Sequence, residues 1–276
     1  MRKGWFTLSI LFLLLAKKTA HAQEVQLTGP LKGAPPAHGL RLYREGRFEI
    51  APSISFTLLD EYRRTILTGA RLHYNITDWI GIGVWGGYGA ISTATDLTEQ
   101  IDAKSVRDER TQKNIAPDAG GFKNQTAKIQ WIAAPQVIFV PFRGKFSLFH
   151  GLFADTDAYL HAGLAFVGLK ERGDCGGDGS LACTEPSSFD LKSRMALAPT
   201  FGLGLNFYLS NFISLGLEYR ALPFSWNRAG FDSRGSGPDE KFPDGKVDSS
   251  DRTFRFNQML TVAIGFSFPT KPAIRE

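Results

Sequence analysis

Histidine and cysteine are the side chains of this sequence that are best suited to metal binding, proton transfer or redox chemistry. Of the five histidines, His21 lies in an N-terminal leader and His38 in a proline-containing stretch. His73, His150 and His161 are too far apart in sequence to form a recognisable metal-binding motif, and a metal site would require them to converge at one end of the fold. We therefore interpret them as solvated or hydrogen-bonded structural histidines, and we predict no metal and no cofactor.

Motifs for other chemistry are also missing from the sequence. There is no Gly-x-Ser-x-Gly, His-Glu-x-x-His or phosphate-loop pattern. Acidic residues gather around Gly245 in the segment 232–251, but their spacing fits no EF-hand calcium loop and basic residues interrupt them. A solvated loop is the better interpretation. We predict that the protein is not an enzyme. The alternative is a membrane enzyme whose active site is built from isolated Ser, His and Asp residues.

The first 22 residues predict a secretory signal peptide. Arg2 and Lys3 precede an apolar run over 5–16, and small residues before Gln23 place the cleavage after Ala22. The apolar run is shorter than the roughly 20 residues that a membrane-spanning helix needs, although an uncleaved anchor remains the alternative. We expect an exported protein.

Charge then excludes one class of partner. The whole chain has 32 Lys and Arg against 27 Asp and Glu, but four of the basic residues lie in the leader. The remaining 28 basic residues nearly balance the acids, which gives no electrostatic case for binding nucleic acid.

Cys175 and Cys183 lie eight positions apart in a glycine-rich segment. In an exported chain a close pair of cysteines is typical of a local disulfide. We therefore predict a Cys175–Cys183 bridge within a loop.

An alternation of apolar and polar residues with period two dominates the rest of the chain. From 254 to 268 the even positions are apolar except for Gln258, while the odd positions are mostly small or polar. Repetition of such a pattern is typical of membrane β-barrels, and no run of 18 apolar residues occurs after the leader. The other predicted strands are 47–59, 65–77, 79–91, 128–142, 157–169, 195–209 and 212–224.

We therefore predict an all-β fold: a transmembrane antiparallel up-and-down β-barrel of about eight strands. The alternative is a soluble β-sandwich or lipocalin-like barrel, but the polar face is then too rich in Gly and Ala and too poor in Lys and Glu. The predicted parts are a signal peptide (1–22), a periplasmic lead-in (23–45), the barrel (46–268) and a C-terminal tail (269–276).

Connection lengths orient the predicted barrel. The links at 77–78 and 210–211 are tight turns, the link at 143–156 is moderately long, and long polar loops occupy 92–127, 170–194 and 225–252. Outer-membrane barrels have short periplasmic turns and long outer loops, so we expect both termini in the periplasm.

Seven charged residues fall on the face that should line the lumen. We expect Glu49 to pair with Arg71, and Glu218 and Arg220 to lie on the strand beside Arg255. Because five of the seven are basic, water or a bound anion is expected near Lys128 and Arg255, in a lumen that side chains fill. The predicted lumen charges are Arg47, Glu49, Arg71, Lys128, Glu218, Arg220 and Arg255.

Four segments resemble a known family: Arg-Phe-Glu-Ile-Ala-Pro at 47–52, the Gly/aromatic stretch 79–89, Gly-Lys-Phe at 144–146, and the last strand ending at Phe268. The chain is similar to the small outer-membrane β-barrel domains common in myxobacteria and their relatives. The resemblance implies an outer-membrane barrel with no settled biochemical activity. The last strand also resembles the signal read by the barrel assembly machinery, but here Pro269–Glu276 follow it.

These observations lead us to expect a structural, anchoring or interaction role in the cell envelope. The alternatives are a narrow porin-like channel for small solutes and, third, a lipid-modifying membrane enzyme. Expected partners are outer-membrane lipid and lipopolysaccharide, the barrel assembly machinery and a further envelope protein, whose identity the sequence does not indicate.

Overall fold

The computed structural model describes residues 44–105, 112, 114–117, 121–148, 152–177, 179–234 and 244–270. The predicted signal peptide, nearly all of the lead-in, His150 and the last six residues of the tail lie outside the described residues.

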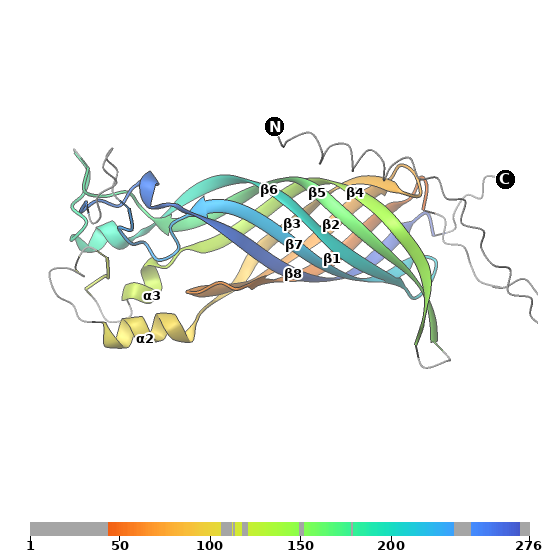
Figure 1. Cartoon of the computed structure of the whole chain (residues 1–276), viewed down its shortest axis with the longest axis horizontal. Helices are drawn as coiled ribbons and strands as arrows, with labels where there is room; N and C mark the ends of the chain where they lie inside the picture. The colour runs from red at the N-terminus through yellow and green to blue at the C-terminus, as the bar shows by residue number, and fades with distance from the viewer. Residues whose placement is uncertain are drawn as a thin grey trace, which may run out of the picture. The chain divides into compact units, whose positions relative to one another are not determined.

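Eight strands follow one another along the chain and close into a barrel (Figure 1). Each pairs antiparallel with the next, and β1 closes the ring against β8, with Phe48 opposite Phe268 and Leu58 opposite Gln258. The fold is thus the eight-stranded up-and-down barrel that the alternation predicts. The strands are β1 (Phe48–Leu58), β2 (Arg63–Asn75), β3 (Ile80–Ala94), β4 (Lys128–Leu148), β5 (Leu152–Arg172), β6 (Leu191–Tyr208), β7 (Ile213–Trp226) and β8 (Thr253–Phe268).

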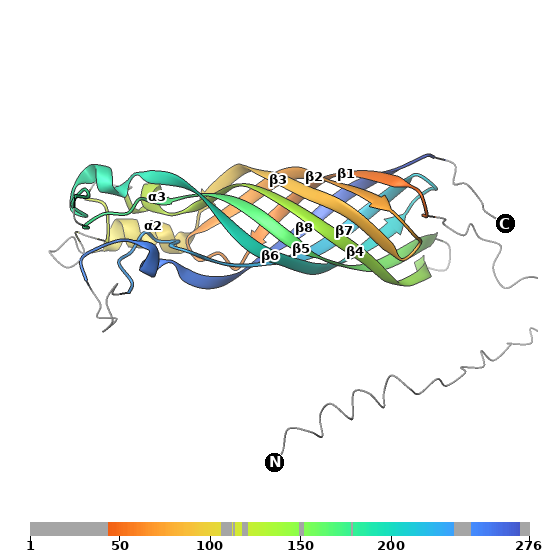
Figure 2. The same ribbon diagram turned by 90° about the horizontal axis from the view of Figure 1, so that it is seen from above.

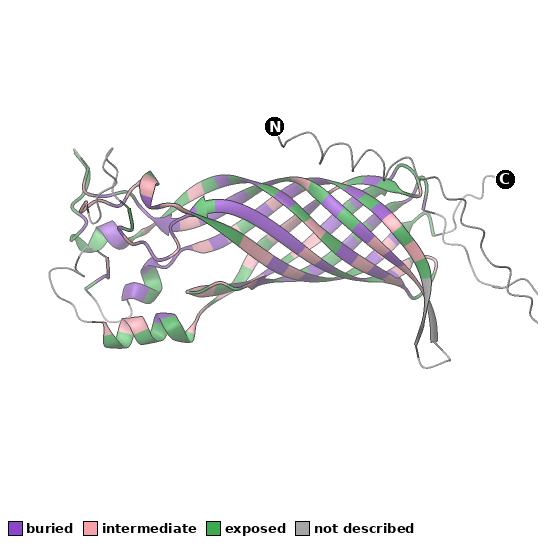
Figure 3. Cartoon of the chain, in the orientation of Figure 1, coloured by how far each residue is buried: buried purple, intermediate pink, exposed green. Residues whose placement is uncertain are grey.

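The outer wall of the barrel is apolar. Buried and exposed residues alternate along the strands, as the banding in Figure 3 shows. On β1 the large side chain of Ile54 is 48% exposed, whereas Ser53 and Ser55 beside it are buried. A soluble protein would bury the large residues and expose the small polar ones, so this inverted pattern suits a barrel whose outer wall contacts lipid.

The hairpin between β4 and β5 differs from the prediction. The segment 143–156, expected to be a moderately long link, instead continues both strands, to Leu148 and from Leu152. A bulge lies between Phe139 and Phe142 in the β4–β5 pairing, around Pro141, which has no backbone amide to donate to the ladder. The ladder therefore continues past the proline.

The two ends of the barrel are built differently. We call the end with the short connections 76–79 and 209–212 the turn end, and the opposite end the loop end. The loop-end connections hold α2 (Asp96–Lys104), α3 (Gly121–Gln125) and the short helices η1 (Pro186–Phe189) and η2 (Ser249–Asp251). Figure 2 shows α2 and α3 together at this end. None of the described helices combines the length and apolar character needed to cross a membrane.

A small aromatic core holds the loop-end segments together. Phe122 of α3 stacks on Phe231 with ring centroids 5.4 Å apart, and Tyr62 meets Phe122 edge to face at 5.8 Å. At the start of α2 the Thr95 hydroxyl accepts a hydrogen bond from the Thr98 backbone amide, which caps the helix. The loop end is thus a folded cap, whereas the sequence predicts only long polar loops there.

Inside the barrel the lumen has two layers. In the loop-end half, large apolar side chains such as Leu67, Trp85, Leu222 and Trp226 form a buried cluster whose members are at most 6% exposed. In the turn-end half the buried residues are largely polar or charged. The prediction of small or polar lumen residues is therefore wrong for the loop-end half, where strand positions of the inward parity carry large apolar side chains.

Candidate functional site

A group of buried charges crosses the turn-end half of the lumen. We call Glu49, Arg71, Tyr159, Glu218 and Arg220 the lumen network. The Arg71 guanidinium donates to Glu49 Oε1 at 2.9 Å and to Glu218 Oε2 at 3.1 Å, so one arginine of β2 joins carboxylates from β1 and β7. All five residues are at most 3% exposed.

Glu218 is the centre of this network. Its Oε2 accepts a hydrogen bond from the Tyr159 hydroxyl at 2.8 Å, and its Oε1 accepts one from Arg220 at 2.6 Å. Arg220 also donates to Gln136 Oε1 at 2.7 Å and to the Thr200 hydroxyl at 3.0 Å. Two carboxylates and two guanidinium groups therefore balance, and buried charges are tolerable when they are paired in this way.

Glycine makes room for the network. Gly204 of β6 lies between Tyr159 and Glu218 in the strand register. A Cβ at Gly204 would collide with the Tyr159 ring, so the ring lies directly over the glycine on its way to Glu218. A residue with no side chain is needed at this close approach.

His73 and His161 are buried beside the network. His73 Nδ1 is 3.7 Å from Glu49 Oε1, and His161 Nε2 is 3.7 Å from Glu218 Oε1. Within the described parts of the chain, no three His, Cys, Asp or Glu residues are arranged to hold a metal ion.

Arg47, which was also predicted to line the lumen, shares the inward parity of Glu49 but is not part of the lumen network. Arg47 is buried at the turn end, where its guanidinium donates to the backbone carbonyls of Pro269 at 3.1 Å and Asn211 at 2.6 Å. Arg44, assigned by sequence to the lead-in, is buried beside it and contacts Asp157 and Tyr208. These two arginines belong to the closure of the turn end.

Lys128 and Arg255 are not in the lumen, which corrects the sequence prediction. A bulge between Ile129 and Trp131 reverses the parity of β4, so Lys128 faces outward. Arg255 has the predicted parity but lies beyond Leu58, where β1 ends, and is exposed at the rim of the barrel. The water or anion expected near Lys128 and Arg255 would therefore lie outside the lumen.

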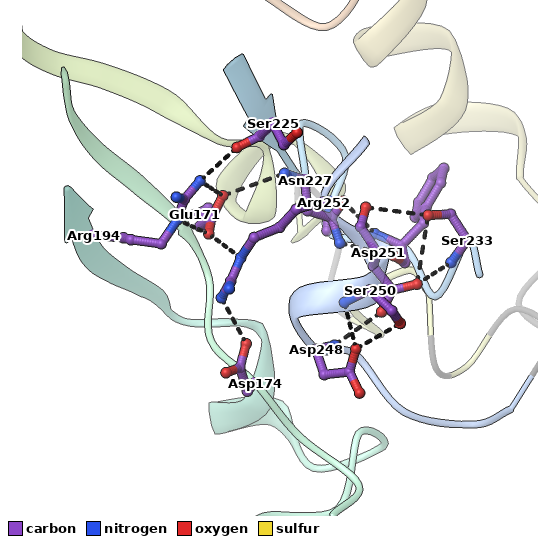
Figure 4. Close-up of polar contacts among 12 residues, drawn as sticks. Glu171, Asp174, Arg194, Ser225, Asn227, Ser233, Asp248, Ser250, Asp251 and Arg252 are labelled. Atoms are coloured by element: carbon purple, nitrogen blue, oxygen red, sulfur yellow. Dashed lines mark hydrogen bonds and ion pairs between the residues drawn. The ribbon is translucent and has the colours of Figure 1, made fainter. Parts of the chain in front are cut away.

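A second polar cluster lies in the cap, where we call Glu171, Asp174, Arg194, Asn227 and Arg252 the cap network (Figure 4). Glu171 pairs with Arg194 and accepts from Arg252 Nε at 2.9 Å and from the Asn227 backbone amide at 3.3 Å. Arg252 also reaches Asp174 at 3.1 Å. The network ties the ends of β5, β6 and β7 to the segment before β8.

Asp251 fixes the neighbouring loop. Its carboxylate accepts hydrogen bonds from the backbone amides of Ser233 at 2.6 Å, Arg234 at 2.9 Å and Asp248 at 2.9 Å (Figure 4). An acidic side chain that the sequence analysis assigned to a solvated loop is thus a buried anchor for backbone amides.

Burial also changes the acidity of Asp60, in the short connection between β1 and β2. Desolvation raises the pKa of Asp60 to about 6, against the opposing effect of Arg228, whose guanidinium lies 3.4 Å away. Asp60 therefore gains its negative charge only as the pH approaches neutrality.

The predicted disulfide is present. Cys175 and Cys183 are bonded, with Cα atoms 5.1 Å apart. Cys175 also forms a two-way backbone bridge with Val247, whose hydrogen bonds measure 2.9 and 3.1 Å. The bridged loop is thereby attached to the segment before β8.

No protein-family model and no curated protein sequence match the chain. The resemblance to the myxobacterial barrel domains therefore gains no support.

Among solved structures, the chain is similar to the N-terminal β-barrel domain of Pseudomonas aeruginosa OprF. The sequence identity is 11% and the TM-score is 0.41, and the match covers 81% of this chain and 98% of that one. It is also similar to the outer membrane protein OprG of the same organism, with 10% identity, a TM-score of 0.39, and 82% and 97% covered. A third similar structure is that of Ail, the attachment invasion locus protein of Yersinia pestis. The sequence identity is 10% and the TM-score is 0.32, and the match covers 81% of this chain and 99% of that one.

Several buried residues of the lumen escaped sequence analysis. Tyr159 and Asp157 share the inward parity of His161 on β5, so extending the alternation backward from that histidine would have found them. Gln136 was hidden by the weak alternation of β4. For Glu171 and Arg252 the sequence offers no such signal, because they meet only through the folding of the cap.

Proposed function

We propose that the protein is a closed outer-membrane barrel with a structural, anchoring or interaction role in the cell envelope. The filled lumen is the observation that carries this proposal. A neutral charge network in one half and an apolar cluster in the other occupy the interior with side chains that are at most 6% exposed. The interior of an eight-stranded barrel is only just wide enough for side chains to fill it. A path for solutes would therefore require both the charge network and the apolar cluster to move.

The outer-membrane location rests on the wall and the ends of the barrel. Large apolar side chains, among them Leu203 at 54% exposure, face outward, while the charged side chains of Glu49, Arg71, Glu218 and Arg220 are buried inside. Closed barrels and helices are the structures that satisfy every backbone group within lipid. Short connections at the turn end support a periplasmic placement for that end and for both termini, after cleavage behind Ala22.

The cap supports the interaction role. Its segments are joined by the aromatic core, the cap network and the disulfide, so it presents a fixed surface at the loop end. The last strand, with Phe268 at its end and 46% exposed, is the segment that the assembly machinery would read.

Conductance measurements test the proposal. Purified wild-type protein in planar bilayers should show no steady current, because the lumen is filled. Porin-like currents would instead establish the narrow channel. Lipid turnover in mixed micelles would establish the membrane enzyme. Recovery of the mature chain in the soluble periplasm would contradict the membrane location itself.

A further inference from the structure

Two lysines face each other on the outer wall at the loop end. Lys128 begins β4, Lys170 lies near the end of β5, and the two are direct partners in the antiparallel register. Side chains of such partners share one face of the sheet, with Cβ atoms about 4.5–5.5 Å apart. The bulge that turns Lys128 away from the lumen thus also places it beside Lys170 on the outer face.

No acid in the described part of the chain pairs with these lysines. Within the described residues neither lysine has an ion-pair partner. Glu171 follows Lys170 directly, but it faces inward and is held by Arg194 and Arg252. Like charges opposite each other in a sheet destabilise it. The protein therefore keeps a repulsive cationic pair that contributes nothing to the stability of the empty barrel.

An aromatic row lies on the same wall, one step toward the membrane. Trp131 is opposite Gly168 in the next outward pair, and a Cβ at Gly168 would collide with the indole ring, so the ring lies directly over the glycine. Tyr88 of β3 is opposite Trp131 and is 61% exposed. Trp and Tyr collect at the headgroup level of membranes, which puts the two lysines at the depth of lipid phosphates.

We propose that Lys128 and Lys170 form a binding site for a phosphate group of an outer-leaflet lipid, whose acyl chains lie along the aromatic and apolar wall below. The proposal rests on the proposed function, because it needs this wall in the membrane and the loop end outside. Arg63, which donates to the Thr126 hydroxyl at 3.1 Å, lies close enough to Lys128 to add to the positive potential. An anion between the lysines turns their repulsion into two favourable contacts.

Lipid binding by the purified full chain in neutral detergent tests this site. The probes are lipopolysaccharide with its lipid A phosphates, the same material after phosphatase treatment, and inorganic phosphate. Each lysine near an anionic lipid contributes about a factor of five in affinity, so Lys128→Gln with Lys170→Gln should weaken binding of the phosphorylated probe about 30-fold. The matched control, Lys104→Gln with Lys246→Gln, removes the same charge from the cap and should bind like the wild type.

Lys170→Glu separates binding from stability. It should abolish binding of the phosphorylated lipid yet raise the urea concentration needed for unfolding, because Lys128 gains an opposite charge. A loss of both would indicate a structural role and overturn the site. Equal binding of the dephosphorylated probe would also overturn it, and so would inorganic phosphate that competes at micromolar concentration, which would indicate a free-anion site. Heat-modifiable migration on gels reports the closed barrel independently, so failure of the site leaves the barrel assignment intact.

Discussion

Glu218 in the lumen and Glu171 in the cap have the same chemistry in different surroundings. Each is a carboxylate with a side chain 3% exposed, and each pairs with two arginines. The partners of Glu218 are fully enclosed, at 4% and 0% exposure for Arg71 and Arg220. Those of Glu171 are 25% and 23% exposed. The arginines of the cap can therefore turn to water if the carboxylate is lost, whereas those of the lumen cannot.

The difference also concerns how the residues are brought together. Glu218 and Arg71 lie on strands whose inward faces are fixed by the alternation of the whole barrel. Glu171 and Arg252 are 81 positions apart and meet through the folding of long connections. Loss of a charge should therefore disturb the entire barrel in the lumen but only the local loops in the cap.

The largest effect is expected for Glu218→Ala, which leaves two buried guanidinium groups with one carboxylate between them. Breaking a buried ion pair costs about 3–5 kcal/mol. The urea midpoint of the folded, heat-modifiable form should fall accordingly. Adding Arg220→Met should recover part of the loss, since removal of both partners leaves no unpaired charge. A double variant as unstable as the single one would show that water already screens the lumen.

Next in size is Leu203→Arg, on the outer wall of β6. A cation at mid-depth in the membrane costs about 2–4 kcal/mol, so the variant should assemble poorly in the outer membrane. Leu181→Arg is the matched control, because Leu181 is similarly exposed, at 45% against 54%, but lies in the cap. Equal levels of folded protein for both variants would indicate that the outer wall of the barrel contacts water and not lipid.

Glu171→Ala should have a smaller effect that is confined to the cap. Hydrogen bonds to charged groups contribute about 1.5–3 kcal/mol, and partial rehydration of Arg194 and Arg252 lowers this to about 1–2 kcal/mol. Protease cleavage within 173–190 and 227–252 should accelerate, while the urea midpoint of the barrel stays in place. Asp174→Ala is the control, because its 62% exposed side chain contributes little. A barrel destabilised as much as by Glu218→Ala would remove the distinction between the two regions.

The same distinction explains what the sequence could predict. The strand order, the closure, and the pairing of Glu49 with Arg71 follow from period-two alternation, which is a local property of the chain. Lys128 was assigned to the wrong face because one bulged residue reverses the parity of everything beyond it. The cap network could not be predicted, since the segments that form it have no periodicity to fix their contacts.

The smallest effect on the barrel is expected from reduction of the Cys175–Cys183 disulfide. The bond closes a short loop, so the chain-entropy model assigns it about 2–3 kcal/mol, all of it local to the cap. Two contacts that do not involve the sulfur atoms should hold the loop near its place. They are the backbone bridge between Cys175 and Val247 and the 2.9 Å hydrogen bond from the Gly176 amide to the Leu181 carbonyl.

Protein treated with reductant should keep its heat-modifiable migration and urea midpoint, while protease cleaves residues 176–182 faster. Cys175→Ser with Cys183→Ser should behave like the reduced wild type, which separates loss of the bond from damage by reductant. If reduction instead unfolds the barrel, the cap and the strands form one cooperative unit, and the comparison between Glu218 and Glu171 no longer describes two independent regions.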